Sequence, residues 1–212
     1  MSEYLVPFED AESEFTEKRS RFISHIWPVE SEEQAQQYIK EMKARYYDAR
    51  HNCWCYLLKE GNIVRYSDDG EPQGTAGQPM LNVFQREEVA NVCCVVTRYF
   101  GGVLLGAGGL TRAYTKGAKD ALDAAGIARM SLWTVWDVPC TYPLLERVKL
   151  DIAAAGGVIR DTAYGADITL RAAFLQENAS AFGKKLTELS AGRLQMTAVG
   201  EEFLPGPREK AK

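Results

Sequence analysis

The stretch from Asn91 to Gly117 carries residue types that suit the binding of an anion or of a polar backbone. Two groups of glycines can expose backbone N–H groups, and the helical pattern that follows adds the positive end of a helix dipole. No Asp or Glu lies between Val89 and Lys119. We therefore predict a binding surface here. Its candidate residues are Arg98, Tyr99, Gly101, Gly102, Gly106, Gly108, Gly109, Arg112 and Lys116, with Lys119 as a further cation.

The glycine spacing differs from that of two common phosphate-binding loops. No Gly-Lys-Ser/Thr follows the glycines, so the stretch is not a Walker A loop. The glycines from Gly106 to Gly109 lack the third glycine and the later acid of a dinucleotide-binding fingerprint. Glycines of this kind also allow a helix to pack closely on a strand, so a structural loop stays open as the alternative to an anion site.

A second chemistry-bearing segment runs from Asp68 to Pro79 and is rich in glycine, proline and acids. The carboxylates of Asp68, Asp69 and Glu71 lie within four residues, which suits a Mg²⁺ site or general acid–base catalysis. The alternative, which we favour, is a turn-rich loop locked by side-chain hydrogen bonds. In either case we expect this loop to abut the glycines, with acids from one loop facing cations from the other.

Two elements must position these residues. The apolar, β-branched run Val92–Val96 predicts a strand buried on both faces, and Leu110 to about Ala125 predicts a helix. Arg112, Lys116, Lys119 and Asp123 share one polar face of that helix. Such a face is most often simply solvated, so its case for function depends on the nearness of Arg112 and Lys116 to the glycines. The expected apolar face is Leu110, Ala113, Tyr114, Ala118, Ala121 and Leu122.

The remaining elements fall into two groups. Before the glycines we expect a hairpin, a helix capped at Ser31, two further strands and a helix whose first turn holds Pro79. After a linker at 127–133, the pattern from Trp133 to Glu201 reads βαββαβ, the ferredoxin-like order. The predicted domains are therefore 1–131 and 132–204, followed by a tail at 205–212 that we expect to be disordered.

Composition narrows the function classes. The chain has 212 residues, a net charge of −4 and no apolar run of transmembrane length. Residues 1–131 carry 15 basic and 19 acidic side chains, and residues 132–212 carry 10 of each. Neither half is therefore a basic domain of the kind that binds nucleic acid broadly. Five cysteines and no signal peptide indicate reduced, buried thiols in the cytoplasm, although a metal site could be drawn from Cys53, Cys55 and His51. We expect no cofactor and no membrane partner.

The two motif segments, SDDGEPQGTAGQP from Ser67 and VVTRYFGGVLLGAGGL from Val95, closely resemble the YigZ/IMPACT family. This family comprises bacterial YigZ proteins and the eukaryotic IMPACT and Yih1 translation regulators. The resemblance implies a two-domain α+β protein. The first domain would have the fold shared by the second domain of small-subunit ribosomal protein S-five and by GHMP kinases. The second, ferredoxin-like domain would resemble the last domain of the translocation elongation factor.

Two functions of different classes follow. The first is a non-catalytic binding protein linked to translational regulation, which contacts RNA, the ribosome or a translation-related protein through the glycines and the adjacent basic helix face. The second is an enzyme that acts on a nucleotide or a phosphorylated small substrate, with the glycines holding phosphate. Asp68, Asp69 or Glu71 would then hold a metal or a proton. The oligomeric state does not follow from the sequence.

Overall fold

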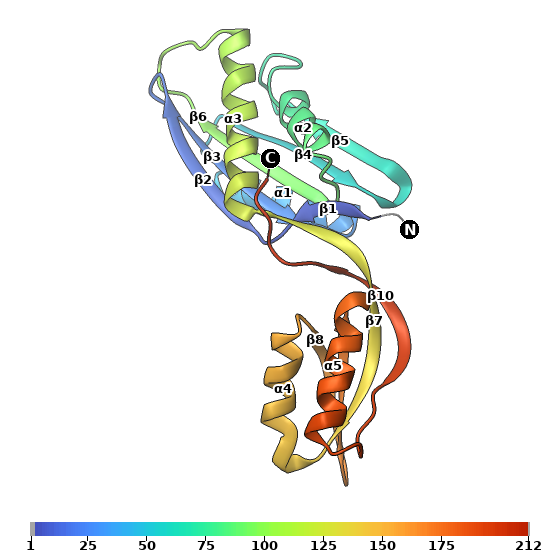
Figure 1. Ribbon diagram of the computed structural model, residues 1–212. Helices are drawn as coiled ribbons and strands as arrows, with labels where there is room; N and C mark the ends of the chain where they lie inside the picture. Colours follow the sequence, from blue (N-terminus) through green and yellow to red (C-terminus); the bar gives the residue numbers. More distant parts are fainter. Residues whose placement is uncertain (1–2, 212) are drawn as a thin grey trace. The chain divides into compact units, whose positions relative to one another are not determined.

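The computed structural model describes residues 3–211, so residues 1, 2 and 212 of the predicted first domain and tail lie outside it. The described residues form two compact units, one made of residues 4–129 and 205–211 and the other of Glu3 and residues 130–204. Both mix helices and strands, which confirms the two-domain α+β class (Figure 1). Within the described residues, no helix has the length and apolar character needed to cross a membrane.

A five-stranded antiparallel sheet is the frame of the first unit. Its order is β2-β3-β6-β4-β5, which places β6 at the centre. The central strand is the predicted apolar run, and its residues from Val92 to Arg98 are buried. The strands are β1 (Tyr4–Pro7), which lies outside this sheet, β2 (Ala11–Glu17), β3 (Ser20–Pro28), β4 (His51–Leu58), β5 (Ile63–Ser67) and β6 (Val92–Tyr99).

Helices cover both faces of this sheet. The helix α1 (Glu32–Arg45) packs on the face that carries Cys93 and Val95, while α2 (Gly77–Arg86) and α3 (Ala107–Ala125) pack on the face of Cys94 and Val96 (Figure 1). Neighbouring residues of β6 thus point to opposite layers, as strand geometry requires. Side chains on the α2/α3 face therefore lie beneath α3, and this decides where Arg98 points.

Local signals set several of these elements. Ser31 accepts a hydrogen bond from the backbone N–H of Gln34 and caps α1, as the sequence predicted. Lys18 and Arg19, both with positive φ, form the tight turn between β2 and β3. The predicted apolar face of α3, from Leu110 to Leu122, is buried.

The second unit has the predicted ferredoxin-like topology. Its strands lie in the order β10-β7-β9-β8, and β1 also pairs with β7. The helices α4 and α5 supply its core together with Phe174 and Ile168 of the sheet. The elements are β7 (Ile127–Cys140), α4 (Leu145–Ala154), β8 (Val158–Tyr164), β9 (Ile168–Phe174), α5 (Gln176–Leu189) and β10 (Thr197–Pro205), with short 3₁₀ turns at Tyr142–Leu144 here and Glu60–Asn62 in the first unit.

Two expectations are wrong. Residues 127–133 form the beginning of β7 rather than a linker, because Ile127 and Ala128 are buried and continue a regular strand. Residues 205–211 are ordered against the first unit rather than disordered. Ile127 and Glu209 exchange two backbone hydrogen bonds, and the Arg208 guanidinium donates to the carbonyl of Ala124 at the end of α3.

All five cysteines are buried as free thiols. Cys53 and Cys55 lie in the core beneath α2 and α3, and burial raises the pKa of both. A raised pKa disfavours the thiolate that a metal requires. Within residues 3–211, no three His, Cys, Asp or Glu side chains gather in a metal-binding arrangement.

Candidate functional site

Arg98, at the end of the central strand β6, is a buried cation. It lies opposite Phe22 of β3 and His51 of β4 in the strand register, and only 4% of its surface is exposed. Strand alternation places its side chain on the same face as Val96, beneath α3. A guanidinium so deeply buried requires compensating acceptors, and these come from other segments.

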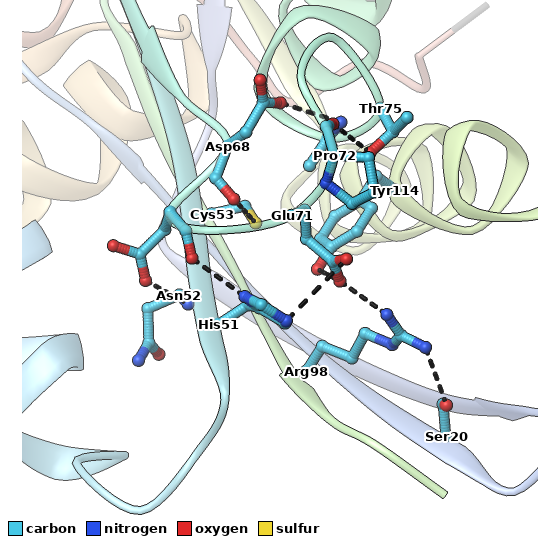
Figure 2. A network of polar contacts seen from close by, with 12 residues as sticks. Ser20, His51, Asn52, Cys53, Asp68, Glu71, Pro72, Thr75, Arg98 and Tyr114 are labelled. Carbon is cyan, nitrogen blue, oxygen red and sulfur yellow. Dashed lines mark hydrogen bonds and ion pairs between the residues drawn. The ribbon is translucent and has the colours of Figure 1, made fainter. Parts of the chain in front are cut away.

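Glu71 supplies the principal compensation. Its Oε1 lies 2.7 Å from Nη1 of Arg98 and also accepts a 2.8 Å hydrogen bond from the Tyr114 hydroxyl of α3 (Figure 2). Burial raises the pKa of Tyr114, which keeps its hydroxyl protonated and able to donate. The expectation that the acidic segment abuts the glycine segment therefore holds for Glu71 and Arg98. Their charges, however, neutralise one another inside the fold.

The glycine loop, defined here as residues 100–106, is tied to the same network. Ser20 Oγ accepts from Nη2 of Arg98 and from the backbone N–H of Gly101, each at 3.2 Å. The Arg98 guanidinium also lies 5.6 Å from the ring centre of Phe22 and 5.5 Å from that of Phe100. The beginning of the loop is thus held by the same cation that pairs with Glu71.

His51 reaches the network from the other side. Its Nδ1 lies 2.9 Å from the carbonyl oxygen of Asp69, which can only accept, so Nδ1 carries the proton. In the neutral imidazole Nε2 is then an acceptor, and it lies 3.8 Å from Oε2 of Glu71 (Figure 2). Both residues are more than nine-tenths buried. In this neutral form two acceptor atoms face each other, and the 3.8 Å gap between them is too long for a direct hydrogen bond.

Asp68 locks its own loop. One carboxylate oxygen accepts from the backbone N–H groups of Ala76 and Gly77 at 3.0 and 2.9 Å, and the other accepts from Gly74 at 2.8 Å. Ala76 and Gly77 begin α2, so the carboxylate satisfies N–H groups that the helix leaves free and complements its dipole. The hydrogen-bonded loop favoured from the sequence thus describes Asp68.

Asp69 also bonds to the protein. Its two oxygens lie 2.7 Å from Nζ of Lys43 and 2.7 Å from the backbone nitrogen of Asn52. The three carboxylates of the segment consequently point to different partners and do not converge. Glu71 alone of the three lines a cavity among those described in this unit.

The glycines singled out from the sequence occupy different structural positions. Gly101 must be glycine because a Cβ there would overlap the carbonyl group of Arg19 in the β2–β3 turn. Gly106 has φ +72 and immediately precedes α3, without a side chain to cap the helix. Because α3 begins at Ala107, Gly108 and Gly109 belong to its first turn and not to the loop. Gly102, with φ +83, lies exposed in the loop.

Tyr99 lies apart from this network. Its side chain points to the opposite face of β6, where its hydroxyl donates to Asp48 at 2.7 Å. This hydrogen bond raises the pKa of Tyr99. Tyr99 therefore shares the strand end with Arg98 but not the cavity.

Two hollows flank Leu105. The larger, called here the Glu71 cavity, has a volume of about 360 Å³ and walls from the start of β4, the acidic loop, the end of β6, the glycine loop and the start of α3. The smaller, of about 230 Å³, is lined by Lys18, Arg112, Lys116 and Glu17 among others. The cations singled out from the sequence therefore line different hollows. Arg98 lines the first, and Arg112 and Lys116 line the second. Lys119 pairs with Glu87 and Asp123.

Comparison with known proteins identifies the family. Residues 18–122 match the Impact N-terminal domain, and residues 138–193 match a domain of unknown function, DUF1949. The IMPACT family member YvyE of Bacillus subtilis is 35% identical over 191 residues, which cover 90% of this chain and 88% of that protein. The chain belongs to the IMPACT family. The resemblance deduced from its motifs is confirmed.

Other members of the IMPACT family align over most of the chain. The family member YigZ of Escherichia coli is 33% identical over 204 residues, which cover 95% of this chain and 100% of that protein. A crystal structure of a hypothetical protein, 33% identical, superposes with a TM-score of 0.59 over 94% of this chain and 98% of that one. The two-domain architecture is thus shared by a solved relative.

Several side chains of this candidate site escaped the sequence analysis. His51 entered it only as a metal candidate, and Ser20, Arg50, Phe100 and Tyr114 had no assigned part in the site. Tyr114 could have been found from the sequence, because it carries a polar hydroxyl on an otherwise apolar helix face. His51 could not, because only the register of β4 against β6 sets it beside Arg98.

Proposed function

We propose that the chain is a non-catalytic, cytoplasmic, RNA-binding protein linked to the regulation of translation. The observation that carries the proposal is a cluster of exposed cations, Lys18, Arg112 and Lys116, which line one hollow beside the glycine loop. We call these three residues the basic rim. The ribosome, through its RNA, and a translation-related protein are partners that the experiments below separate.

The charge of the basic rim supports a narrow, backbone-directed contact. Glu17 is the acid that lines the same hollow, and Lys116 pairs with Asp120 at 2.6 Å, so the net positive charge is small. Arg112 and Lys18 are exposed and extend the rim toward the glycine loop. If about three cations contact phosphates of a single-stranded RNA, the logarithm of the affinity should fall with the logarithm of the salt concentration with a slope of about −2. Binding should therefore be weak and strongest at low salt.

The translational link rests on family membership. The match to the Impact N-terminal domain covers residues 18–122, which include both motif segments and all three cations of the basic rim. The same motif segments resemble the eukaryotic translation regulators. An enzyme that uses Asp68, Asp69 and Glu71 on a phosphorylated substrate has less support. Asp68 accepts hydrogen bonds from the backbone at the start of α2, and Asp69 binds Lys43 and the backbone of Asn52, so neither carboxylate is free to hold a substrate or a metal.

Reversing two charges of the basic rim should strongly weaken RNA binding. We expect Arg112→Glu with Lys116→Glu to weaken binding of a single-stranded RNA more than tenfold, because two phosphate contacts become repulsive. Fluorescence anisotropy at low salt measures this, and co-sedimentation with ribosomes tests the same surface on an assembled partner. The matched control is Arg86→Glu, a reversal of an exposed cation at the end of α2, outside both hollows.

Wild-type protein that bound neither RNA nor ribosomes at low salt would contradict the proposal. So would a double variant that bound as well as the Arg86→Glu control. Ribosome binding that persisted after nuclease treatment and did not depend on salt would instead indicate a protein partner.

A further inference from the structure

We propose that the Glu71 cavity binds a ribonucleoside phosphate, with the ribose diol on His51 and Glu71 and the phosphate at the start of α3. This site is separate from the basic rim, and it can exist whether or not the rim binds RNA. Four features of the cavity carry the inference: a pair of buried acceptors, an uncapped helix start, an exposed arginine and an apolar ring.

The acceptor pair defines the polar half of the ligand. His51 Nε2 and Glu71 Oε2 are 3.8 Å apart, and both residues line the cavity (Figure 2). With the His51 imidazole neutral, both atoms are acceptors, and no donor among residues 3–211 lies within hydrogen-bond distance of either. Buried acceptors left without donors are costly, so a ligand that offers two donors gains from meeting them. Two adjacent hydroxyl groups suit two adjacent acceptors, and a ribose presents such a diol.

Arg98 does not compete for these acceptors. Its Nη1 and Nη2 are taken by Oε1 of Glu71 and by Ser20, so it holds the Glu71 carboxylate in place from behind. Its buried Nε has no partner within the described residues. Arg98 therefore orients Glu71 while leaving Oε2 open toward His51.

The opposite wall favours an anion. Gly106 and Ala107 line the cavity, and because Gly106 has no side chain, no side-chain group caps the free N–H groups of the first turn of α3. The exposed Arg50 adds a full positive charge to the same cavity. With Arg98 neutralised by Glu71, Arg50 and the helix start leave this wall net positive. A phosphate group meets both requirements.

An apolar surface completes the cavity. Phe100 is 39% exposed and Leu104 is 82% exposed, and both line it. The Arg50 guanidinium lies 5.8 Å from the ring centre of Phe100, so the ring is bordered by a cation. A nucleobase can stack on such a ring. The volume of about 360 Å³ lies within the range of about 300–1,000 Å³ that is usual for small-ligand sites.

Titration calorimetry on the full chain tests the site. The probes are the four ribonucleoside 5′-monophosphates, their 2′-deoxy counterparts and inorganic phosphate. We expect at least one ribonucleotide to bind about tenfold more tightly than its deoxy counterpart, because a lost hydroxyl leaves a buried acceptor unpaired. Inorganic phosphate alone should bind more weakly than either.

Two variants locate the binding. His51→Gln should reduce ribonucleotide affinity and the preference over the deoxy form, while Arg50→Gln should reduce affinity for both forms about equally. Arg50 is exposed, so its replacement leaves the core intact even where His51→Gln disturbs the fold. Arg86→Gln is the matched control and should bind as the wild type does. Failure of every ribonucleotide to bind, an equal affinity for deoxy forms, or binding unaffected by Arg50→Gln would overturn the inference.

A free nucleotide and the 3′ end of an RNA both carry the required diol. A short RNA with a 3′ hydroxyl end should compete with the mononucleotide if the end enters the cavity, whereas the same RNA with a 3′ phosphate should not. The Arg112→Glu, Lys116→Glu variant separates the two proposals. It should lose RNA binding at the rim and keep mononucleotide binding, so failure of one proposal is distinguishable from failure of the other.

Discussion

Replacing Arg98 with methionine should lower the free energy of unfolding of the first unit by about 3–5 kcal/mol, because it leaves the Glu71 carboxylate buried without its partner. The Arg98 and Glu71 side chains are only 5% and 3% exposed, so water cannot replace the lost ion pair. Tyr114 still donates to Glu71, but one neutral hydrogen bond does not compensate a buried charge. Ser20 and the N–H of Gly101 also lose the cation that anchors them.

Urea unfolding measures this loss, with hydrogen exchange of peptides from β6 as the readout. Because β6 belongs to the first unit, this readout reports on that unit alone. The matched control is Arg21→Met, which breaks an exposed arginine–carboxylate pair with Glu14 on the neighbouring strands. The loss in the free energy of unfolding should be far smaller for Arg21→Met, since both side chains of that pair face water. Adding Glu71→Gln to Arg98→Met should restore part of the stability, because the buried charge is then removed. Equal effects of Arg98→Met and Arg21→Met would contradict the role of the buried pair.

Replacing Gly101 with alanine should displace the glycine loop and lower the free energy of unfolding by about 3 kcal/mol, at the upper end of the range usual for overpacked sites. The added methyl group would overlap the backbone carbonyl of Arg19, and a backbone contact cannot be relieved by a rotamer change. The loop would have to move away from the β2–β3 turn, which also breaks the hydrogen bond from Gly101 to Ser20.

The neighbouring position gives a matched control. Gly102 has φ +83 but has nothing within 4 Å of an added Cβ, so Gly102→Ala should cost about 1–2 kcal/mol of backbone strain and leave the loop in place. Hydrogen exchange of the 100–106 segment, measured with the urea midpoint, distinguishes the two. A Gly101→Ala protein with wild-type exchange in this loop would show that the loop does not rest on Arg19.

The sequence predicted the parts of the fold that local signals decide. The β-branched run from Val92 predicted the central strand, and Ser31 predicted the cap of α1. The order of strand and helix patterns after Trp133 predicted the ferredoxin-like topology. The start of α3 was placed three residues late, since two glycines are poor helix formers. Packing overrides that preference, because a Cβ at Gly109 would lie 3.0 Å from Leu105.

The candidate site was less predictable because its bonds join distant segments. Glu71 and Arg98 are 27 residues apart, and Arg98 and Ser20 are 78 apart. No local sequence pattern predicts that the Glu71 carboxylate points into the fold while those of Asp68 and Asp69 bind backbone and surface groups. A lone His51 at a strand start has no spacing signal at all. Its part depends on the strand register and on the carbonyl of Asp69 that fixes its proton.

The return of residues 205–211 to the first unit has a consequence for the order of events during synthesis. The backbone groups of Ile127 receive Glu209 as their partner, and the carbonyl of Ala124 in α3 receives Arg208, only after residues 130–204 have been added. At about 5–20 residues per second this interval lasts several seconds. The unit that is made first is therefore completed last, and a ribosome that stalls within the second unit would hold a first unit whose closing strand segment is missing.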